Sequence, residues 1–305
     1  MTFNMTPKDK DAKLIKIYFF ICDKFEELHY YCERFSNNKE PEFTDQEVMT
    51  LYLYVMYHQG HTKIKDIHRF ACEYLRDWFP KLVSYQAFNN RLNRLSGAFN
   101  RLVDILRRDS IPDDCIFDQS LLDSMPIVTC SGRRLGKVAP ELTDKGRCPS
   151  KGMYYYGMKL HALGFRRLGK LPYPQEILFT PASVNDINVY KQAWAQMKNR
   201  TFFGDKIYMD HQLNQQIMIE HNSEMYTPVK AVKGMADVIK KRDKAANDLF
   251  STAVSRVRQP IEAFFNWLIE KVDIQKASKV RSTKGLLIHI FGRLAAAFLN
   301  FKFNP

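Results

Sequence analysis

The sequence lacks the signals of a zinc-binding, disulfide-bonded, exported or membrane-spanning protein. Its six cysteines form no CxxC pair and no cysteine–histidine spacing typical of zinc. The most apolar stretch, 286–301, is interrupted by His289 and Arg293 and is shorter than the roughly 20 residues of a membrane helix. The N-terminus, MTFNMTPKDKDAK, has no apolar signal core. We therefore expect reduced thiols, a cytoplasmic location and no membrane partner.

Acidic residues are also in short supply relative to basic ones. The 305 residues include 46 Lys and Arg against 33 Asp and Glu, which gives a net charge of +13. Such an excess favours a polyanionic partner, either nucleic acid or an anionic membrane surface, and does not by itself choose between them. The length allows a sizeable core, and two domains are the natural expectation.

The first 110 residues show apolar residues at helical spacing and no strand pattern, which predicts an all-α N-terminal domain. Thr44 and Glu47 form a capping-box pattern, so a helix is expected to begin there, and Gly60 is expected to end it. The other expected helices are 14–35, 63–78 and 85–108.

The helix expected at 85–108 is the most informative of these. It has an apolar stripe on one side, and on the opposite side it carries Asn90, Arg94, Arg101 and Arg108. Arg and Asn suit base edges and phosphates, so this face is a candidate DNA contact. An ordinary solvated face fits the same pattern. Gly97, in the middle, predicts a bend or break.

After residue 110 the pattern changes to alternating strands and helices. Residues 115–128, CIFDQSLLDSMPIV, carry an apolar run that predicts a buried strand with Asp123 inside it. A carboxylate there loses solvation unless a cation or donor meets it. Pro126 cannot donate to a ladder, so we expect the strand to end or bulge nearby.

The rest of this part predicts an α/β order. Strands are expected at 153–163 and 175–180 as an antiparallel pair, at 201–208 ending on Asp205, and at 224–230, with helices after 186 and at 211–221. A basic, helix-prone segment follows at 231–258. A last helix is expected at 258–272, with Pro260 in its first turn and Glu262 next to its apolar face.

The order of two aspartates in strands and one glutamate on a late helix is that of the ribonuclease-H-like DDE nucleases. Five motifs are closer still to one group, and they are LLDSMPI, GMKLH, TPASVND, FGDKIY and RQPIE. In order and spacing they resemble the insertion sequence 982 family of DDE transposases. The likeness runs over most of the chain, including the helical first third.

This resemblance implies a fold and an activity. The fold would be an α/β ribonuclease-H-like catalytic domain at 111–305, a mixed sheet with flanking helices, preceded by the all-α N-terminal domain at 1–110. The activity would be that of a DNA transposase, an endonuclease that cuts double-stranded DNA at the terminal inverted repeats of its own mobile element. It then joins the 3′-OH ends to target DNA, and a homodimer is expected in the synaptic complex.

By the same resemblance the catalytic and metal-binding residues are Asp123, Asp205 and Glu262. Hard carboxylate oxygens suit Mg²⁺ or Mn²⁺, and two ions are expected. Arg258 matches the R-x3-E part of the signature of related transposases, while Ser255 stands where that signature has tyrosine. Asp118 and Asp210 remain alternative ligands.

Further basic residues are candidate DNA contacts. Lys159 and His161 lie two apart on one strand face, although a hydrogen-bonded structural role for His161 is equally open. Lys206 and Arg258 are candidate phosphate partners or solvated charges. The loop arginines that would supply non-specific affinity are Arg133, Arg134, Arg166 and Arg167.

Two other classes of function remain open. One is a catalytically inactive or co-opted transposase-derived DNA-binding protein, and the other is a scaffolding protein that uses its basic surface for acidic partners. Metal-dependent nicking of DNA separates the enzyme from both.

Overall fold

The computed structural model describes residues 7–32, 40–148, 152–229 and 237–304. They form two compact units. The helical unit comprises Met1–Ser110 and Leu268–Pro305, and the sheet unit comprises Ile111–Trp267. By packing, residues 268–305 thus lie with the helical unit and not with the predicted 111–305 domain. The division into DNA-binding and catalytic domains stays a prediction.

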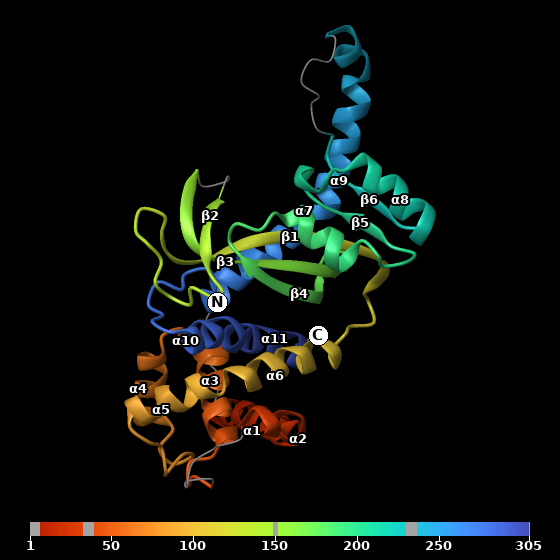
Figure 1. The fold of residues 1–305 in the computed structure, drawn as a ribbon. Coiled ribbons are helices and arrows are strands. Elements are labelled where there is room, and N and C mark those ends of the chain that lie inside the picture. The colour runs from red at the N-terminus through yellow and green to blue at the C-terminus, as the bar shows by residue number, and fades with distance from the viewer. Residues whose placement is uncertain (1–6, 33–39, 149–151, 230–236, 305) are drawn as a thin grey trace. The chain divides into compact units, whose positions relative to one another are not determined.

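The helical unit is built from helices in both of its segments (Figure 1). They are α1 (Pro7–Asp23), α2 (Phe25–Cys32), α3 (Asp45–Gln59), α4 (Ile64–Tyr74), α5 (Tyr85–Arg94), α6 (Ser96–Arg108), α10 (Thr283–Leu287) and α11 (Arg293–Phe303). The predicted start of α3 is confirmed, because Thr44 and Glu47 form a complete capping box. Gly60 ends α3 in the left-handed conformation, as expected.

The segment Thr283–Phe303 is 21 residues long and apolar enough to cross a membrane by length and composition alone. In the structure 72% of its most apolar window is buried. Its apolar residues pack inside the helical unit, and Arg293 donates to the carbonyl of Thr62 at 2.8 Å. This is how the core helix of a small helical unit behaves.

The expected helix 85–108 is broken into α5 and α6 at Leu95. The break allows Gly97 to pack against Tyr31, where an added Cβ would lie 3.1 Å from the ring. The arginines of this segment are engaged inside the unit. Arg91 and Arg94 donate to Asp45 at 3.2 and 2.6 Å, and Arg101 donates to Glu27 at 2.6 Å.

We expect Asp45→Ala to lower the free energy of unfolding by about 3–5 kcal/mol, because it leaves two arginines without their buried partner. Asp45 is only 7% exposed. The matched control is Asp104→Ala, which removes the ion pair between Arg107 and the half-exposed carboxylate of Asp104. This control should lower the free energy of unfolding by less than about 1 kcal/mol. Urea unfolding measures both, and equal losses would contradict the structural role of Asp45.

The sheet unit contains one mixed sheet. Its strands are β1 (Ile116–Ser131), β2 (Asp144–Cys148), β3 (Met153–Arg166), β4 (Tyr173–Pro181), β5 (Thr201–Phe203) and β6 (Glu224–Tyr226). The order is β2-β3-β1-β5-β6, and β4 also pairs with β3. β3 pairs antiparallel with β1, with β2 and with β4. β5 pairs parallel with β1 and with β6. This mixed sheet fits a ribonuclease-H-like fold.

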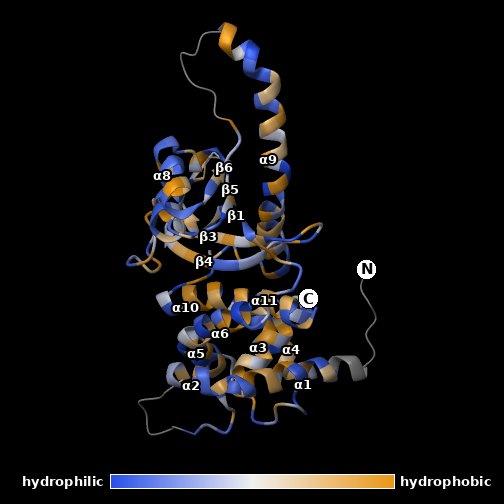
Figure 2. Ribbon diagram, turned by 90° about the vertical axis from the view of Figure 1, so that its right-hand side faces the viewer, coloured by the Kyte–Doolittle hydropathy of each residue, from blue (hydrophilic) through white to orange (hydrophobic). Residues whose placement is uncertain are grey.

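Helices cover both faces of the sheet. On one face, Leu122, Leu163 and Phe202 pack with buried residues of α7 (Asp186–Val189), of the π-helical turn Tyr190–Trp194 and of α8 (His211–His221). α9 (Asp237–Val272) lies on the opposite face (Figure 2), where Ile261, Phe264 and Phe265 are buried. Because side chains alternate along β1, Asp123 points to the face opposite Leu122, the face of α9.

The irregularity expected near Pro126 is confirmed in the form of a bulge, because β1 continues to Ser131 with a register shift against β3 between Val128 and Cys130. The polar segment DKGRC, where no strand was expected, forms β2, which pairs with the free edge of β3. The expectation that the last helix begins at 258 is wrong.

Instead α9 is one 36-residue helix with Pro260 inside it. The residues before Pro260 are mostly good helix formers, and packing of Val254 and Ile261 on either side offsets the hydrogen bond that proline loses. Glu262 therefore lies well inside the helix, away from its N-terminus. Residues 231–236 of the predicted basic segment lie outside the described residues.

Candidate active site

Asp123 lies in the middle of β1, paired with Ala162 of β3. Its side chain is 22% exposed, so most of its hydration is lost. One carboxylate oxygen accepts a hydrogen bond from the Ser124 backbone N–H at 2.8 Å. The other accepts from the guanidinium of Arg258 at 2.9 Å. A carboxylate in a buried strand was expected to need a cation or a hydrogen-bond donor as its partner, and Arg258 is that cation.

Arg258 joins β1 to α9. The same guanidinium that donates to Asp123 also donates to Glu262, one helical turn further along α9. The side chain of Arg258 is 13% exposed and that of Glu262 is 50% exposed, so Arg258 is largely buried while Glu262 is open to solvent. One arginine thus brings two of the three predicted acidic residues together.

Asp205 approaches from the parallel part of the sheet. β5 ends at Phe203, so Asp205 follows the strand by two residues instead of ending it. Its carboxylate accepts from the backbone N–H of Lys206 at 2.6 Å and caps the 3-10 turn Lys206–Tyr208. Gly204 allows this turn to close, because a Cβ there would lie 2.8 Å from the ring of Tyr208.

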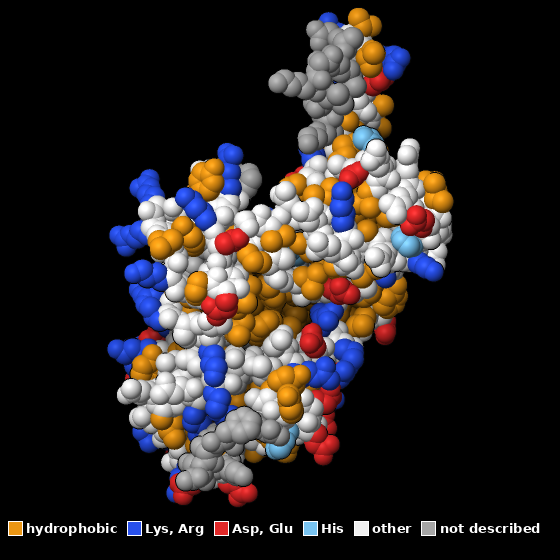
Figure 3. Space-filling model, in the orientation of Figure 1, with side chains coloured by type: hydrophobic (Ala, Val, Ile, Leu, Met, Phe, Trp, Pro, Cys, Tyr) orange, Lys and Arg blue, Asp and Glu red, His pale blue; other side chains and the backbone are white. Residues whose placement is uncertain are grey.

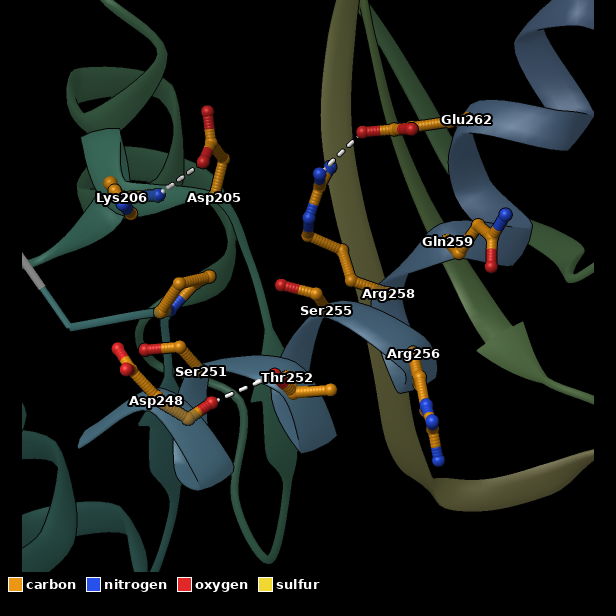
Figure 4. Close-up of a pocket in the computed structure, with 11 residues that line it drawn as sticks. Asp205, Lys206, Asp248, Ser251, Thr252, Ser255, Arg256, Arg258, Gln259 and Glu262 are labelled. Carbon is orange, nitrogen blue, oxygen red and sulfur yellow. Dashed lines mark hydrogen bonds and ion pairs between the residues drawn. The ribbon is translucent and has the colours of Figure 1, made fainter. Parts of the chain in front are cut away.

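Asp205 and Glu262 line one pocket of about 610 Å³ in the sheet unit. Figure 4 shows Asp205 and Lys206 on one side and the residues of α9 on the other. The α9 residues that line it share one helix face, since they recur every three or four positions. They are Asp248, Ser251, Thr252, Ser255, Arg256, Arg258, Gln259 and Glu262.

Burial raises the pKa of Asp123 to about 6. The guanidinium of Arg258 and the Ser124 N–H oppose this rise, while the negative charges of Asp205 and Glu262 add to it. The negative charges of both other carboxylates therefore act on Asp123.

The chemistry of these donors fits a hard divalent cation, because carboxylate oxygens are the ligands that Mg²⁺ and Mn²⁺ prefer. A buried carboxylate with a raised pKa and two acidic neighbours is also a place where added positive charge is favourable. Across the residues that the structure describes, no group of three or more His, Cys, Asp or Glu side chains is arranged to hold a metal ion. The guanidinium of Arg258 takes the position between Asp123 and Glu262 instead.

The two alternative ligands lie in other roles. Asp210 caps α8 by accepting from the Leu213 N–H at 3.1 Å, and it pairs with Lys191 at 2.7 Å. These two donors lower its pKa. Asp118 is exposed at an irregular part of β1.

The candidate DNA-contacting residues of the helical unit are mostly engaged in internal contacts. Arg94 and Arg101 make the ion pairs described above, and Arg108 pairs with Glu27 and Asp109. Asn90 is exposed. The arginine face that the sequence suggested for DNA therefore serves in large part to join helices of this unit.

In the sheet unit, several candidates are likewise held inside. His161 is fully buried, with Nε2 2.8 Å from the Thr180 hydroxyl, so it forms no part of a DNA-facing surface. Burial lowers its pKa to about 4. Lys159 donates to Asp186 at 3.0 Å, so its charge is paired within the sheet unit.

The arginines of the β3–β4 turn are also bound. Arg167 is buried and donates to Asp114 at 2.6 and 3.1 Å, and Arg166 donates to Gln119 at 2.7 Å. Arg133, Arg134 and Lys206 are exposed. These three, with Asn90 and the ion-paired Arg108, are the predicted contacts that the structure leaves exposed to solvent.

Sequence reasoning missed the polar residues of α9 that line the pocket. Ser251 and Thr252 were not placed on the helix of Glu262 because that helix was expected to begin at 258, and Gln259 was not singled out within it. The signal was present, since Ser251, Ser255, Gln259 and Glu262 recur at helical spacing. Extending the helix through Pro260 would have placed them on one face with Glu262.

Comparison with known proteins identifies the family. Residues 118–299 match the family model described as the transposase DDE domain. A search of curated proteins and a search of solved structures each give no match. The matched range contains β1 with Asp123, the turn with Asp205 and α9 with Glu262. Since the match spans more than half of the chain, the protein belongs to the transposases that carry a DDE domain.

Proposed function

We propose that the protein is an active transposase of an insertion sequence, of the insertion sequence 982 family, with Asp123, Asp205 and Glu262 as its catalytic and metal-binding residues. The observation that carries the proposal is the convergence of these three carboxylates from β1, the β5 turn and α9 on one side of the sheet. They are far apart in the sequence, and Asp123 lies largely buried in the middle of a strand, where an ionisable group is costly without a partner of opposite charge.

The substrate is double-stranded DNA at the terminal inverted repeats. Water attacks a phosphodiester at the element end, the bond from phosphorus to the 3′ oxygen breaks, and a 3′-OH is released. That hydroxyl then attacks a phosphodiester of target DNA, so one P–O bond forms as another breaks. Two Mg²⁺ or Mn²⁺ ions bound by the three carboxylates would supply Lewis-acid chemistry for both steps.

The other residues of the pocket have roles in binding phosphate. The three cations at its wall, Lys206, Arg256 and Arg258, suit phosphate oxygens. The hydroxyls of Thr252 and Ser255 are neutral donors on the same face. A divalent cation held by Asp123 and Glu262 would replace the guanidinium of Arg258 as their partner and would leave that guanidinium available to a phosphate.

The proposal extends to assembly and location on family grounds. Two element ends must be held together for strand transfer, so a homodimer is expected in the synaptic complex. The enzyme would act in the cytoplasm, on the nucleoid.

The test incubates the purified protein with Mg²⁺ or Mn²⁺ and a DNA that carries candidate element ends. Nicked ends followed by joined products are expected, and neither should form in EDTA. Salt-sensitive DNA binding without any nicking would instead indicate the inactive or co-opted DNA-binding protein.

We expect Ser255→Glu to reduce cleavage by about 10-fold or more, because a negative charge added to the pocket wall opposes a phosphate there. Ser255 is exposed on the pocket face of α9. The matched control is Ala253→Glu, an exposed position on the same helix that lies roughly 200° around it and outside the pocket. Equal activities for the two variants would contradict a phosphate path along this face.

A further inference from the structure

One end of the sheet extends well beyond its parallel strands. β5 pairs with β1 only at Gln119–Leu121, whereas β3 pairs with β1 as far as Ser131. β2 pairs with the first residues of β3, from Met153 to Gly157. These strands and the loop between β1 and β2 form a three-stranded extension, here called the arm, residues 128–148 and 152–157 (Figure 1).

The arm has its own packing. Cys148, Tyr155 and Ala182 form a small buried cluster, which Val128 and Met153 flank. Asp144 at the start of β2 accepts from the Ser183 N–H at 2.8 Å. These contacts hold the surface of the arm in a defined shape.

The loop before β2 lies directly on β3. Gly132 donates its N–H to the carbonyl of Tyr154 at 2.9 Å. A Cβ at Gly136 would lie 2.7 Å from the ring of Tyr156, so only glycine allows this approach. The basic residues next to these glycines are thus carried on a packed loop.

Five exposed basic residues lie on the arm, namely Arg133, Arg134, Lys137, Lys145 and Arg147. Its two acidic residues are Glu141 and Asp144, and Ser183 binds the second. In the part of the chain that the structure describes, no carboxylate makes an ion pair with any of the five cations. Lys145 instead lies 5.4 Å from the ring centroid of Tyr154, which is 56% exposed.

This differs from several arginines elsewhere in the chain. Arg94, Arg101 and Arg167 each bind a carboxylate of their own unit. Their charge is largely neutralised in place, whereas the charge on the arm faces solvent. Figure 3 shows Lys and Arg side chains gathered at the edge of the sheet unit that carries β2.

We propose that the arm binds the phosphate backbone of double-stranded DNA, outside the cleavage pocket and without regard to sequence. This rests on the proposed function and adds a second DNA contact to it. Unpaired cations on a rigid surface suit phosphates, and release of their counterions gives affinity to any sequence. The arm presents one exposed ring among five cations, whereas sites for single strands use successive rings for stacking. Duplex DNA is therefore the fitting partner.

The test compares two triple variants of the full chain. The arm variant is Lys137→Gln, Lys145→Gln and Arg147→Gln. The control variant is Lys63→Gln, Lys65→Gln and Arg76→Gln, which removes the same three charges from exposed positions of the helical unit. Binding to a fluorescent duplex of arbitrary sequence is measured over a range of salt concentrations without divalent cations.

The arm variant should bind about 10- to 100-fold more weakly than the parent at low salt, and its dependence of log K on log salt should be shallower by about 2–3. The control variant should match the parent. Equal losses in both variants, or no loss in the arm variant, would overturn the proposal. If the arm variant has a lowered melting temperature, the single reversals Lys145→Glu and Lys65→Glu make the same comparison.

Failure of the arm can be told from failure of the proposed function. If the parent protein nicks element ends and binds DNA, and the arm variant binds DNA equally well, only the proposal for the arm is refuted. A parent protein that binds no duplex at any salt concentration refutes both.

Discussion

Asp123→Asn, Asp205→Asn and Glu262→Gln will each reduce DNA cleavage by about a thousandfold or more. Each change keeps the shape of the side chain and removes the negative charge that would hold a divalent cation. Asp123 should be the most sensitive, because it is the most buried of the three and is affected by both of the others.

DNA binding should survive these changes. Carboxylates repel phosphates, so the amide variants should bind duplex DNA as well as the parent or slightly more tightly. The measurement pairs a nicking assay in Mn²⁺ with a binding assay in EDTA. Asp118→Asn is the control, since Asp118 is an exposed acidic residue of the same strand. If the Asp123 variant still cleaves DNA and the Asp118 variant does not, Asp118 and not Asp123 is the catalytic aspartate of this strand.

Arg258→Gln should lower the free energy of unfolding by about 3 kcal/mol at pH 8 in EDTA, because it leaves a buried carboxylate without its cation. The pKa of Asp123 already lies above its ordinary value of 3.8, at about 6, and Arg258 is the largest influence that lowers it. Removing Arg258 raises that pKa further.

The sign of the pH dependence follows. A carboxyl whose pKa is higher in the folded state destabilises the fold when ionised, so its penalty is absent below about 3.8 and complete above the folded-state value. The variant should therefore approach the stability of the parent near pH 4 and fall furthest below it at pH 8. Denaturant unfolding at both pH values measures this.

Added Mn²⁺ provides a second measurement on the same variant. At pH 8 the ion should restore much of the lost stability, because it can neutralise Asp123 and Glu262 in place of the guanidinium. An equal loss at both pH values, unaffected by Mn²⁺, would mean that Arg258 acts through packing alone. Lys271→Gln, a change on the same helix away from the pocket, is the control.

Much of the fold follows from local sequence signals. The capping box at Thr44 and Glu47 places α3, and the apolar run around Asp123 gives β1. The antiparallel pairing of β3 with β4 and the parallel β5 and β6 also agree with the strand and helix order. These elements depend on patterns within about 10–20 residues, which a single sequence contains.

The remaining elements depend on contacts far along the chain. β2 has no apolar run, and it forms because β3 offers a free edge and Gly146 packs on Ala182. α9 continues through Pro260 because its apolar face is buried on both sides of it. In the site, the ion pair from Arg258 to Asp123 joins residues 135 positions apart, which no local pattern reveals.

The ion pairs of Asp45 and Glu27 affect how charge-neutralisation screens of this chain should be interpreted. Substituting Arg94 or Arg101 would weaken the helical unit itself, and a loss of retention on a DNA column would then report partial unfolding. A true phosphate contact changes the salt dependence of binding, whereas a folding defect lowers the active fraction at every salt concentration. For this protein the slope of a titration, more than its midpoint, distinguishes residues that touch DNA from residues that keep the protein folded.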